Sequence, residues 1–207
     1  MRKFISGLVL GAGASSRLGQ PKQLLPYRGT TLLGWVVAQA QQAGELDEVV
    51  VVLGRAASEI RERVDFGRAR VVENPSFGDG CASSYRAGIG ATDPRSEAVM
   101  ILLGDQPGVS PEIINRVAES WRSSAHQIVL ACYQGRTGHP MLFAKPLFEN
   151  LVELHGDKAA WKLVDANPEL VGKAEFDLAF PQDVNTPDDF ERLSQSEAQI
   201  EAQIEKS

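Results

Sequence analysis

Short apolar runs alternate with stretches of helical periodicity, and this alternation constrains the fold more than any other feature of the chain. The apolar runs are Phe4–Leu10, Glu48–Leu53, Ala69–Glu73, Ala98–Leu103 and Gln127–Cys132. The helical stretches between them are Thr31–Ala43, Ala56–Val64, Cys81–Ala91 and Pro111–Ser123. Continuous apolar runs suit strands covered on both faces, and strand–helix alternation implies right-handed crossovers between parallel strands. We therefore expect a three-layer α/β/α domain with a mostly parallel sheet.

The second half of the chain has a different pattern. From Gln134 onward, glycines and a proline interrupt the alternation, and helical stretches follow near Pro146–Leu154 and Lys158–Ala166. We expect this part to cover the carboxyl-terminal edge of the sheet. The last residues are rich in Gln, Glu, Ser and Ala, which is typical of a frayed or partner-dependent helix. We predict one domain over 1–193 and a polar tail without a catalytic role over 194–207.

Charge and hydropathy exclude some classes of partner. Asp and Glu outnumber Lys and Arg by 27 to 21, giving a formal net charge of −6, so no broad basic face for nucleic acid is expected. The first apolar run is far too short to span a membrane and lacks a signal-peptide cleavage region. We expect a cytoplasmic protein with a small-molecule partner and no membrane partner.

The first apolar run leads into a glycine-rich loop with two basic residues. The glycines allow tight turns and bring backbone N–H groups close to an anion. Arg17 can clamp a phosphate with two hydrogen bonds, and Lys22 adds a point charge. We predict a nucleoside triphosphate site in this loop, with contacts from Leu10, Gly11, Ala12, Gly13, Ser15, Arg17 and Lys22.

The loop has three alternative interpretations. Gly-x-Gly after a strand also begins the dinucleotide-binding fingerprint, but Ser16 stands where that fingerprint has its last glycine, and basic residues follow at once. The loop does not have the Walker A pattern either. The remaining alternative is an ordinary glycine-rich turn with solvated charges, which the spacing of Arg17 and Lys22 disfavours.

The full motif resembles a known family. Leu-Gly-Ala-Gly, Arg-Leu-Gly and Lys-x-Leu-Leu-Pro follow one another from Leu10 to Pro26. This string is similar to the signature of the nucleotidyltransferases that complete the molybdenum cofactor, especially the cytidylyltransferase branch. Gly11 and Leu18 depart from that family's usual Leu-Ala-Ala-Gly and Arg-Met-Gly, whereas Ala12 matches the cytidylyl branch. The resemblance extends from Leu8 to about Leu193 and implies a Rossmann-like nucleotidyltransferase sheet.

A carboxylate follows the fourth apolar run, where Pro107 turns the chain away from the strand. Mg²⁺ commonly takes one or two protein oxygens and completes its shell with phosphates and water, so Asp105 suffices as a first ligand. The alternative is an Asx turn or a helix N-cap. Asp105-Gln106-Pro107 resembles the family's Asp-Gln-Pro, which implies that Asp105 is the principal metal ligand and a catalytic residue.

The segment from Asp183 to Asp189 resembles the family's closing motif, Asp-x-Asp-Thr-Pro-x-Asp. Asn185 stands where an Asp is typical. An amide oxygen can bind Mg²⁺ but adds no negative charge, so either Asp183 shares the task or metal affinity falls. The alternative, compatible with the first, is that Thr186 caps a helix beginning at the next residue.

Three further segments carry weaker predictions. The stretch 74–84 resembles the family segment near the base, which implies nucleotide contacts from Gly80 and Ser83; the alternative is an ordinary helix N-cap. Gly-His-Pro around His139 and Gly-Asp-Lys around Asp157 resemble strings on the acceptor side. We favour positioning over proton transfer for His139, because a phosphate nucleophile is already ionised at neutral pH. A structural role for this histidine stays open.

The resemblance implies transfer of a cytidylyl group from CTP to the terminal phosphate of the molybdenum-pterin cofactor. Arg17, Lys22 and Asp105 are the predicted catalytic residues, and Mg²⁺ is the predicted cofactor. A molybdenum hydroxylase is a further expected partner. The alternatives are the same chemistry with GTP or another phosphate acceptor, a nucleotide-binding oxidoreductase, or a chaperone for a molybdenum hydroxylase. Lys22 and Asp105 count against the oxidoreductase.

Overall fold

Seven strands form one mixed sheet in the computed structural model, which describes residues 2–13, 15, 18–156 and 159–204. The strand order is β5-β4-β1-β6-β8-β7-β9. The bounds are β1 (Ile5–Gly11), β4 (Glu48–Leu53), β5 (Arg70–Glu73), β6 (Ala98–Leu103), β7 (Ile128–Tyr133), β8 (Arg136–Ala144) and β9 (Val171–Phe176). All five apolar runs are strands, so the sequence located the larger part of the sheet.

The parallel strands bring one set of loops together. β1 pairs in parallel with β4 and β6, and β5 pairs in parallel with β4. The register places Leu10 beside Val52 on one side and Leu103 on the other. The loops that follow β1, β4 and β6 therefore leave the sheet at the same edge, where ligands of open α/β sheets bind.

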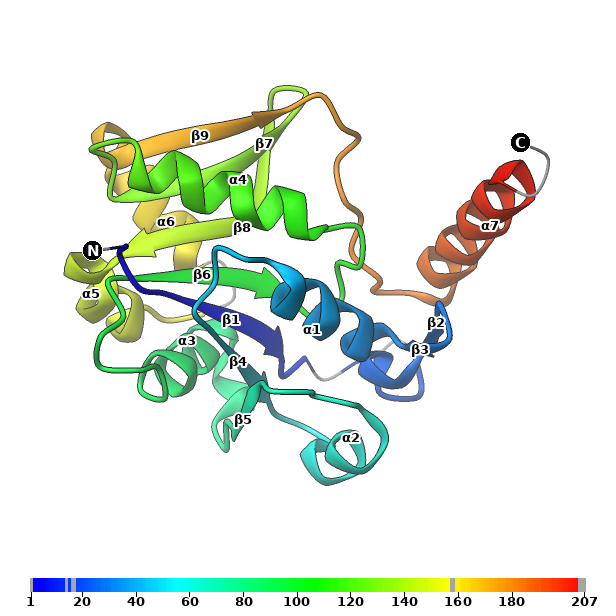
Figure 1. Cartoon of the computed structure of the whole chain (residues 1–207). Helices are drawn as coiled ribbons and strands as arrows, with labels where there is room; N and C mark the ends of the chain where they lie inside the picture. Colours follow the sequence, from blue (N-terminus) through cyan, green and yellow to red (C-terminus); the bar gives the residue numbers. More distant parts are fainter. Residues whose placement is uncertain (1, 14, 16–17, 157–158, 205–207) are drawn as a thin grey trace.

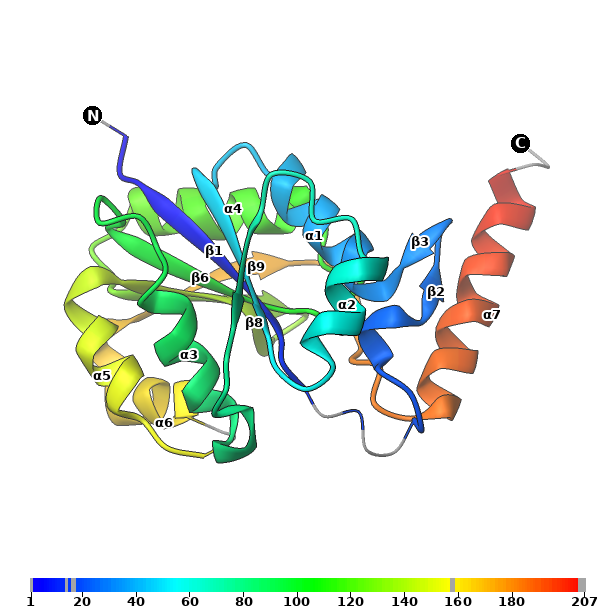
Figure 2. The same ribbon diagram turned by 90° about the horizontal axis from the view of Figure 1, so that it is seen from below.

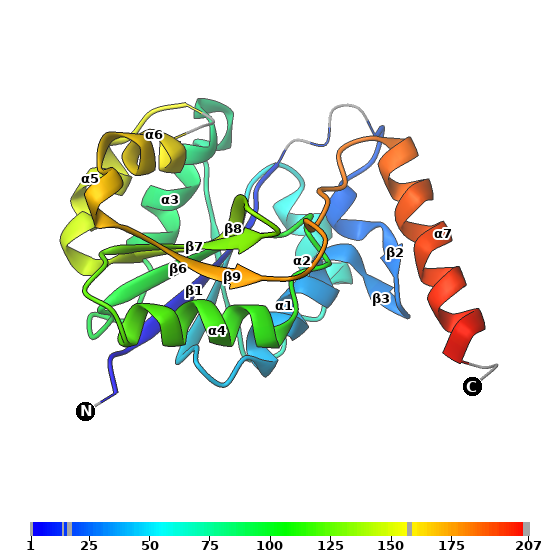
Figure 3. The same cartoon turned by 90° about the horizontal axis from the view of Figure 1, so that it is seen from above.

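Helices cover both faces of the sheet. The helices α1 (Leu32–Gln42) and α4 (Pro111–Arg122) lie on one face, and α3 (Cys81–Ile89), α5 (Phe148–Glu153) and α6 (Ala159–Ala166) lie on the other (Figure 3). Adjacent residues of β1 alternate between the two cores: Val9 packs with the α1 and α4 side, and Leu8 with the α3 side. This confirms the expected three-layer α/β/α architecture with a mostly parallel sheet.

The predicted helices of the first half end within two residues of the observed ones. The remaining helical elements of the described part are short, apart from the last. They are η1 (Lys22–Leu24), α2 (Ala57–Arg63), η2 (Phe77–Asp79), η3 (Lys145–Leu147), η4 (Pro168–Leu170) and α7 (Pro187–Ile204). No helix in this part of the chain has both the length and the apolar composition needed to cross a bilayer.

The expectation that the segment after Gln134 only covers the sheet edge is wrong. β8 lies inside the sheet, antiparallel to β6 on one side and to β7 on the other. Its proline is tolerated because the pairing with β7 shifts register between Leu130 and Ala131, so His139 and Pro140 fall at an irregularity of the ladder. The His139–Pro140 peptide bond is cis. β9 then adds a strand that the sequence analysis did not predict.

The last helix lies beside a small hairpin and away from the sheet. The hairpin pairs β2 (Pro26–Tyr27) with β3 (Thr30–Thr31), and α7 runs past it (Figures 1 and 2). Phe190 and Leu193 of α7 pack against a cluster of Leu25, Tyr27, Leu32 and Val184. The helix continues without a break from the predicted domain into the predicted tail.

Candidate active site

A cavity of about 400 Å³ opens at the carboxyl ends of β1 and β6. Its lining residues come from the glycine-rich loop, from the turn before α3 and from the end of β6. They are Leu10, Gly11, Ala12, Gly13, Lys22, Gln23, Phe77, Gly78, Gly80, Cys81, Ser84, Leu103, Gly104 and Asp105. Most of the residues predicted from sequence to bind a nucleotide therefore share one cavity.

Ser83 does not line this cavity, although it was predicted to contact the nucleotide. Its hydroxyl accepts a hydrogen bond from the Asn74 amide at 2.8 Å and donates to the Gly80 carbonyl at 2.8 Å. Ser83 thus joins the end of β5 to the start of α3. The neighbouring Ser84, which was not singled out, lines the cavity instead.

Close backbone packing explains why glycines occur at these strand ends. A Cβ atom on Gly104 would lie 2.9 Å from the Leu10 carbonyl oxygen, and one on Gly54 would lie 2.7 Å from the Ala12 carbonyl oxygen. Neither neighbour is a flexible side chain, so any larger residue would push the three strand ends apart. The tight packing leaves the backbone of the loop as one wall of the cavity.

Gln23 holds the loop in shape, and sequence reasoning missed it. This side chain is 2% exposed, and its amide donates to the carbonyls of Gly11 at 2.7 Å and Gly13 at 3.1 Å. Ser15 accepts a hydrogen bond from the Lys22 backbone at 2.9 Å. Both ends of the loop are tied together in this way. Arg17, the other predicted cation, lies outside the described residues.

Lys22 brings the two predicted metal-binding segments together. Its ammonium group pairs with Asp105 and donates to the Asn185 side-chain oxygen at 2.9 Å. The backbone N–H of Val184 donates to the Asp105 carbonyl at 3.0 Å, which holds the closing segment against the end of β6. Lys22 and Asp105 side chains are only 13% and 16% exposed, so their charges attract each other with little solvent screening.

Asp183 is hydrogen-bonded to Gln106, whereas Asp105 and Asn185 contact Lys22. Burial, and then the negative charge of Asp105, raises the pKa of Asp183, while Lys22 opposes the shift. Its carboxylate accepts a hydrogen bond from Gln106 at 2.9 Å. Of the two candidates for the second metal ligand, Asn185 is the one that points with Asp105 at a common position.

The oxygens of Asp105 and Asn185 fit a hard cation. Both contact the same ammonium nitrogen, so they converge on one place that already holds positive charge. No group of three or more His, Cys, Asp and Glu side chains suited to a metal occurs among the described residues. Mg²⁺ does not need one, because water and phosphate oxygens complete its shell.

A second cavity, of about 370 Å³, adjoins the first and shares Cys81 and Leu103 with it. It lies against β8 and contains His139, Gln106 and Asp183. Burial lowers the pKa of His139 to about 4, so the imidazole is neutral at physiological pH. This favours positioning over a cationic role for His139. Asp157, the other residue predicted for the acceptor side, lies outside the described residues.

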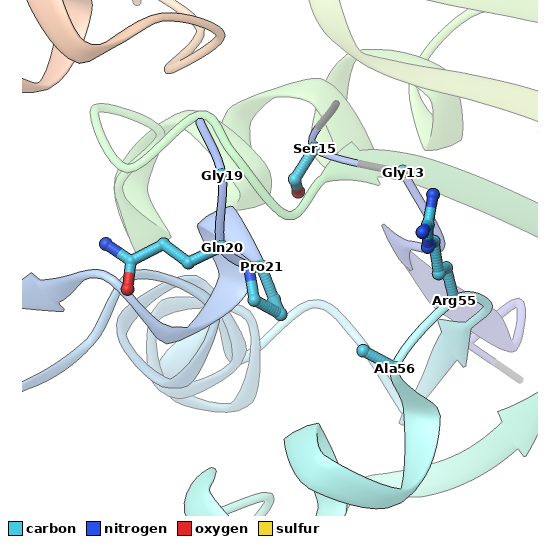
Figure 4. Close-up of a pocket in the computed structure, with 7 residues that line it drawn as sticks. All are labelled: Gly13, Ser15, Gly19, Gln20, Pro21, Arg55 and Ala56. Atoms are coloured by element: carbon cyan, nitrogen blue, oxygen red, sulfur yellow. The ribbon is translucent and has the colours of Figure 1, made fainter. Parts of the chain in front are cut away.

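A third cavity, of about 330 Å³, borders the glycine-rich loop and shares Gly13 with the first cavity (Figure 4). Gly13, Ser15, Gly19, Gln20 and Pro21 line it from the loop, and Arg55 and Ala56 line it from the turn after β4. The Arg55 side chain lies beside Gly13 in Figure 4. Arg55 follows an apolar strand and precedes α2, a local signal that sequence reasoning did not use.

A glycine-rich backbone, a lysine and an aspartate meet at the carboxyl ends of parallel strands, which is where open α/β sheets bind nucleotides. The chain belongs to the family described as the MobA-like NTP transferase domain, whose sequence profile matches residues 7–171. The protein is therefore a nucleotidyltransferase, as the resemblance of its glycine-rich motif indicated.

Individual relatives extend this result. The nicotine blue oxidoreductase of Paenarthrobacter nicotinovorans is 34% identical over 91% of this chain and 96% of its own length. The molybdenum cofactor cytidylyltransferase of Escherichia coli K12 is 27% identical over 90% of this chain and 93% of its own. The crystal structure of Rv0371c from Mycobacterium tuberculosis H37Rv is 40% identical, with a TM-score of 0.85 over 93% of this chain and 98% of that one. Rv0371c has also been solved in complex with manganese.

Proposed function

We propose that this protein transfers a cytidylyl group from CTP to the terminal phosphate of the molybdenum-pterin cofactor and releases pyrophosphate. The observation that carries the proposal is the convergence of Lys22, Asp105 and Asn185 at the cavity that the glycine-rich loop lines. Ala12 supports CTP over GTP, because it matches the cytidylyl branch. The similarity to the Escherichia coli cytidylyltransferase supports the same choice.

The reaction needs positioning and charge neutralisation more than acid–base chemistry. An oxygen of the acceptor phosphate forms a bond to the α-phosphorus of CTP, and the bond from that phosphorus to the bridging oxygen breaks. Pyrophosphate leaves with the electron pair. In this proposal Lys22, Arg17 and the loop N–H groups from Gly11 to Ser15 attract the phosphates and stabilise the charge of the transition state.

Mg²⁺ is the proposed metal. Asp105 and Asn185 would hold it, and the negative charge of the nearby Asp183 would add to the attraction for the cation. When bound, a divalent cation neutralises phosphate charge and orients the triphosphate. Because Asn185 carries no charge, we expect weaker metal binding than a pair of carboxylates would give. A cytoplasmic location and delivery of the product to a molybdenum hydroxylase belong to the same proposal.

One relative favours a second candidate. The similarity to an enzyme named nicotine blue oxidoreductase spans nearly the whole chain, so a nucleotide-dependent redox reaction is the alternative activity. The two candidates differ in their nucleotide and in their need for metal. A cytidylyltransferase requires CTP with a divalent cation, whereas a hydride-transferring enzyme binds a reduced dinucleotide without one.

Thermal unfolding with CTP, GTP, ATP, UTP and NADPH, each with and without Mg²⁺, tests the proposal. At a hundredfold excess over Kd, binding adds about 2.7 kcal/mol, which raises Tm by roughly 5 to 10 °C for a chain of this size. We expect a shift with CTP that requires Mg²⁺. A shift with GTP instead would keep the chemistry and overturn the role of Ala12. A metal-independent shift with NADPH alone would overturn the nucleotidyltransfer proposal.

Two variants test whether nucleotide binding and catalysis depend on Asp105 and Lys22. Asp105→Ala should abolish the Mg²⁺-dependent shift, and Lys22→Ala should lower kcat for pyrophosphate release far more than it lowers Tm. Glu62→Gln is the control for loss of one negative charge, because Glu62 is exposed on α2. Full activity in Lys22→Ala would remove this lysine from the mechanism.

A further inference from the structure

The third cavity, which borders the glycine-rich loop, carries a positive charge that no lining side chain neutralises. Arg55 is the one charged side chain among the described residues that line it. In Figure 4 this side chain extends from the turn after β4 toward Gly13, with its guanidinium group beside the loop. A cavity whose described charge is entirely positive suits an anionic ligand.

Arg55 has no partner within the protein. Within the described part of the chain, no hydrogen bond or ion pair joins its side chain to another residue. Two acidic side chains around α2 have other partners: Glu59 pairs with Arg63 at 2.9 Å, and Glu73 pairs with Arg61 at 2.9 Å. The guanidinium of Arg55 therefore keeps all its donors for a ligand.

The backbone that carries Arg55 is fixed against the glycine-rich loop. A Cβ atom on Gly54 would lie 2.7 Å from the Ala12 carbonyl oxygen and 2.7 Å from the Phe77 Cβ atom, so the chain is packed closely against both. Ala56 then adopts a left-handed conformation, with φ of 62°, immediately before α2. Since the turn is already ordered, only the exposed side chain of Arg55 loses freedom when a ligand binds.

Gly13 connects this cation to the first cavity. It lines both cavities, and a Cβ atom on it would lie 3.5 Å from the Lys22 Cε atom. The lysine side chain therefore passes Gly13 before its ammonium group pairs with Asp105. Arg55 lies beside the same glycine (Figure 4). Asp105 partly neutralises the charge of Lys22, whereas the charge of Arg55 is not neutralised by any described residue.

We propose that Arg55 binds the two terminal phosphates of the nucleoside triphosphate and holds the pyrophosphate that leaves. The proposal rests on the proposed function and adds to it a residue that distinguishes a triphosphate from a monophosphate. The triphosphate runs from Lys22 past Gly13 to Arg55, where a guanidinium can donate two parallel hydrogen bonds to phosphate oxygens. Negative charge grows on the leaving phosphates as their bond to the α-phosphorus breaks, so this cation also stabilises the transition state.

Calorimetric titration with inorganic pyrophosphate, CTP and CMP, each with Mg²⁺ at low ionic strength, tests this assignment. CMP has only the α-phosphate, so its binding does not involve Arg55. Arg55→Gln should raise the Kd for pyrophosphate and for CTP roughly tenfold and leave the Kd for CMP within about twofold, because charge-assisted hydrogen bonds to the terminal phosphates are lost. Arg55→Lys keeps the charge without the paired donors and should have an intermediate effect. Arg63→Gln is the matched control, because Arg63 is exposed on α2 and the net charge changes by the same amount.

The proposal is supported when Arg55→Gln loses affinity for pyrophosphate and CTP while Arg63→Gln keeps it. It is overturned when Arg55→Gln binds pyrophosphate as tightly as the unmodified protein, when its affinity for CMP falls as far as that for CTP, or when the unmodified protein binds no pyrophosphate. Pyrophosphate has no base, so its titration does not depend on the choice of nucleotide. Binding of pyrophosphate that depends on Arg55, without any binding of CTP, would contradict the proposed function and leave the phosphate site supported.

Discussion

At the scale of single residues, the site depends on contacts between positions far apart in the chain. Lys22 and Asp105 are 83 positions apart, and Lys22 and Asn185 are 163 apart, yet one ammonium group contacts both. The residue types and their local motifs were predictable from sequence. That Asn185, rather than Asp183, points at the common position was not, because the choice depends on the hydrogen bond from Val184 to Asp105.

His139 carries the residue-scale prediction, which concerns pH. Its pKa is lowered from 6.5 to about 4 in the folded protein, so below pH 6.5 the unfolded chain binds a proton that the native state does not. Stability should therefore fall as pH falls from about 6.5 to 4. Below pH 4 this group causes no further loss of stability. Between pH 7.5 and 5, the free energy of unfolding measured with urea should fall less for His139→Phe than for the unmodified protein, by about 1 to 2 kcal/mol. Parallel profiles of stability against pH for the two proteins would contradict the lowered pKa of His139.

At the scale of elements, the start of α7 links helix capping to the site. The Asp189 N–H donates to the Thr186 hydroxyl at 3.2 Å, and the Thr186 N–H donates to the Asp189 carboxylate at 2.8 Å. These reciprocal bonds form a capping box, and hydrogen bonding of the Asp189 carboxylate with the Thr186 side chain, and then with the backbone N–H groups of Asn185 and Thr186, lowers the pKa of Asp189. The same carboxylate accepts from the Asn185 N–H at 3.1 Å, so the cap also holds Asn185. The helix start at Pro187 was predictable because a cap is a local pattern.

Removal of this cap is the element-scale prediction. Thr186→Ala should lower the free energy of unfolding by about 1 kcal/mol and weaken the Mg²⁺-dependent CTP shift, because Asn185 loses part of its support. Thr186→Ser keeps the hydroxyl and is the control. Urea unfolding and thermal shift measure the two effects, and an alanine variant that behaves like the serine variant would show that the cap contributes little.

At the scale of the whole molecule, the boundary between domain and tail stays a prediction. The apolar contacts of α7 that the structure describes come from Phe190 and Leu193, before the predicted tail. A protein ending at Leu193 should therefore keep its CTP-dependent shift and a Tm within about 2 °C of the full chain. A protein ending at Gln182 lacks Asn185 and should lose the shift. Loss of the shift on removal of 194–207 alone would assign the tail a role in the domain.

The sequence by itself determined the features that depend on neighbouring residues. Apolar runs such as Glu48–Leu53 predicted strands, because a strand buried on both faces needs continuous apolar side chains. The glycine-rich loop and the cap at Thr186 were also predictable from sequence, because each uses residues within a few positions of one another. These local patterns were enough to indicate the three layers, the edge of the sheet that carries the site, and the family.

The tertiary structure decided whatever depends on pairing between distant segments. β8 was missed because its glycine and proline suit a loop, and only its neighbours β6 and β7 in the sheet make it a strand. The second cavity combines Gln106 from the end of β6 with His139 from β8, and neither residue indicates the other along the chain. Which side chains line a cavity depends on how distant segments pack, so this cavity could be recognised only in three dimensions.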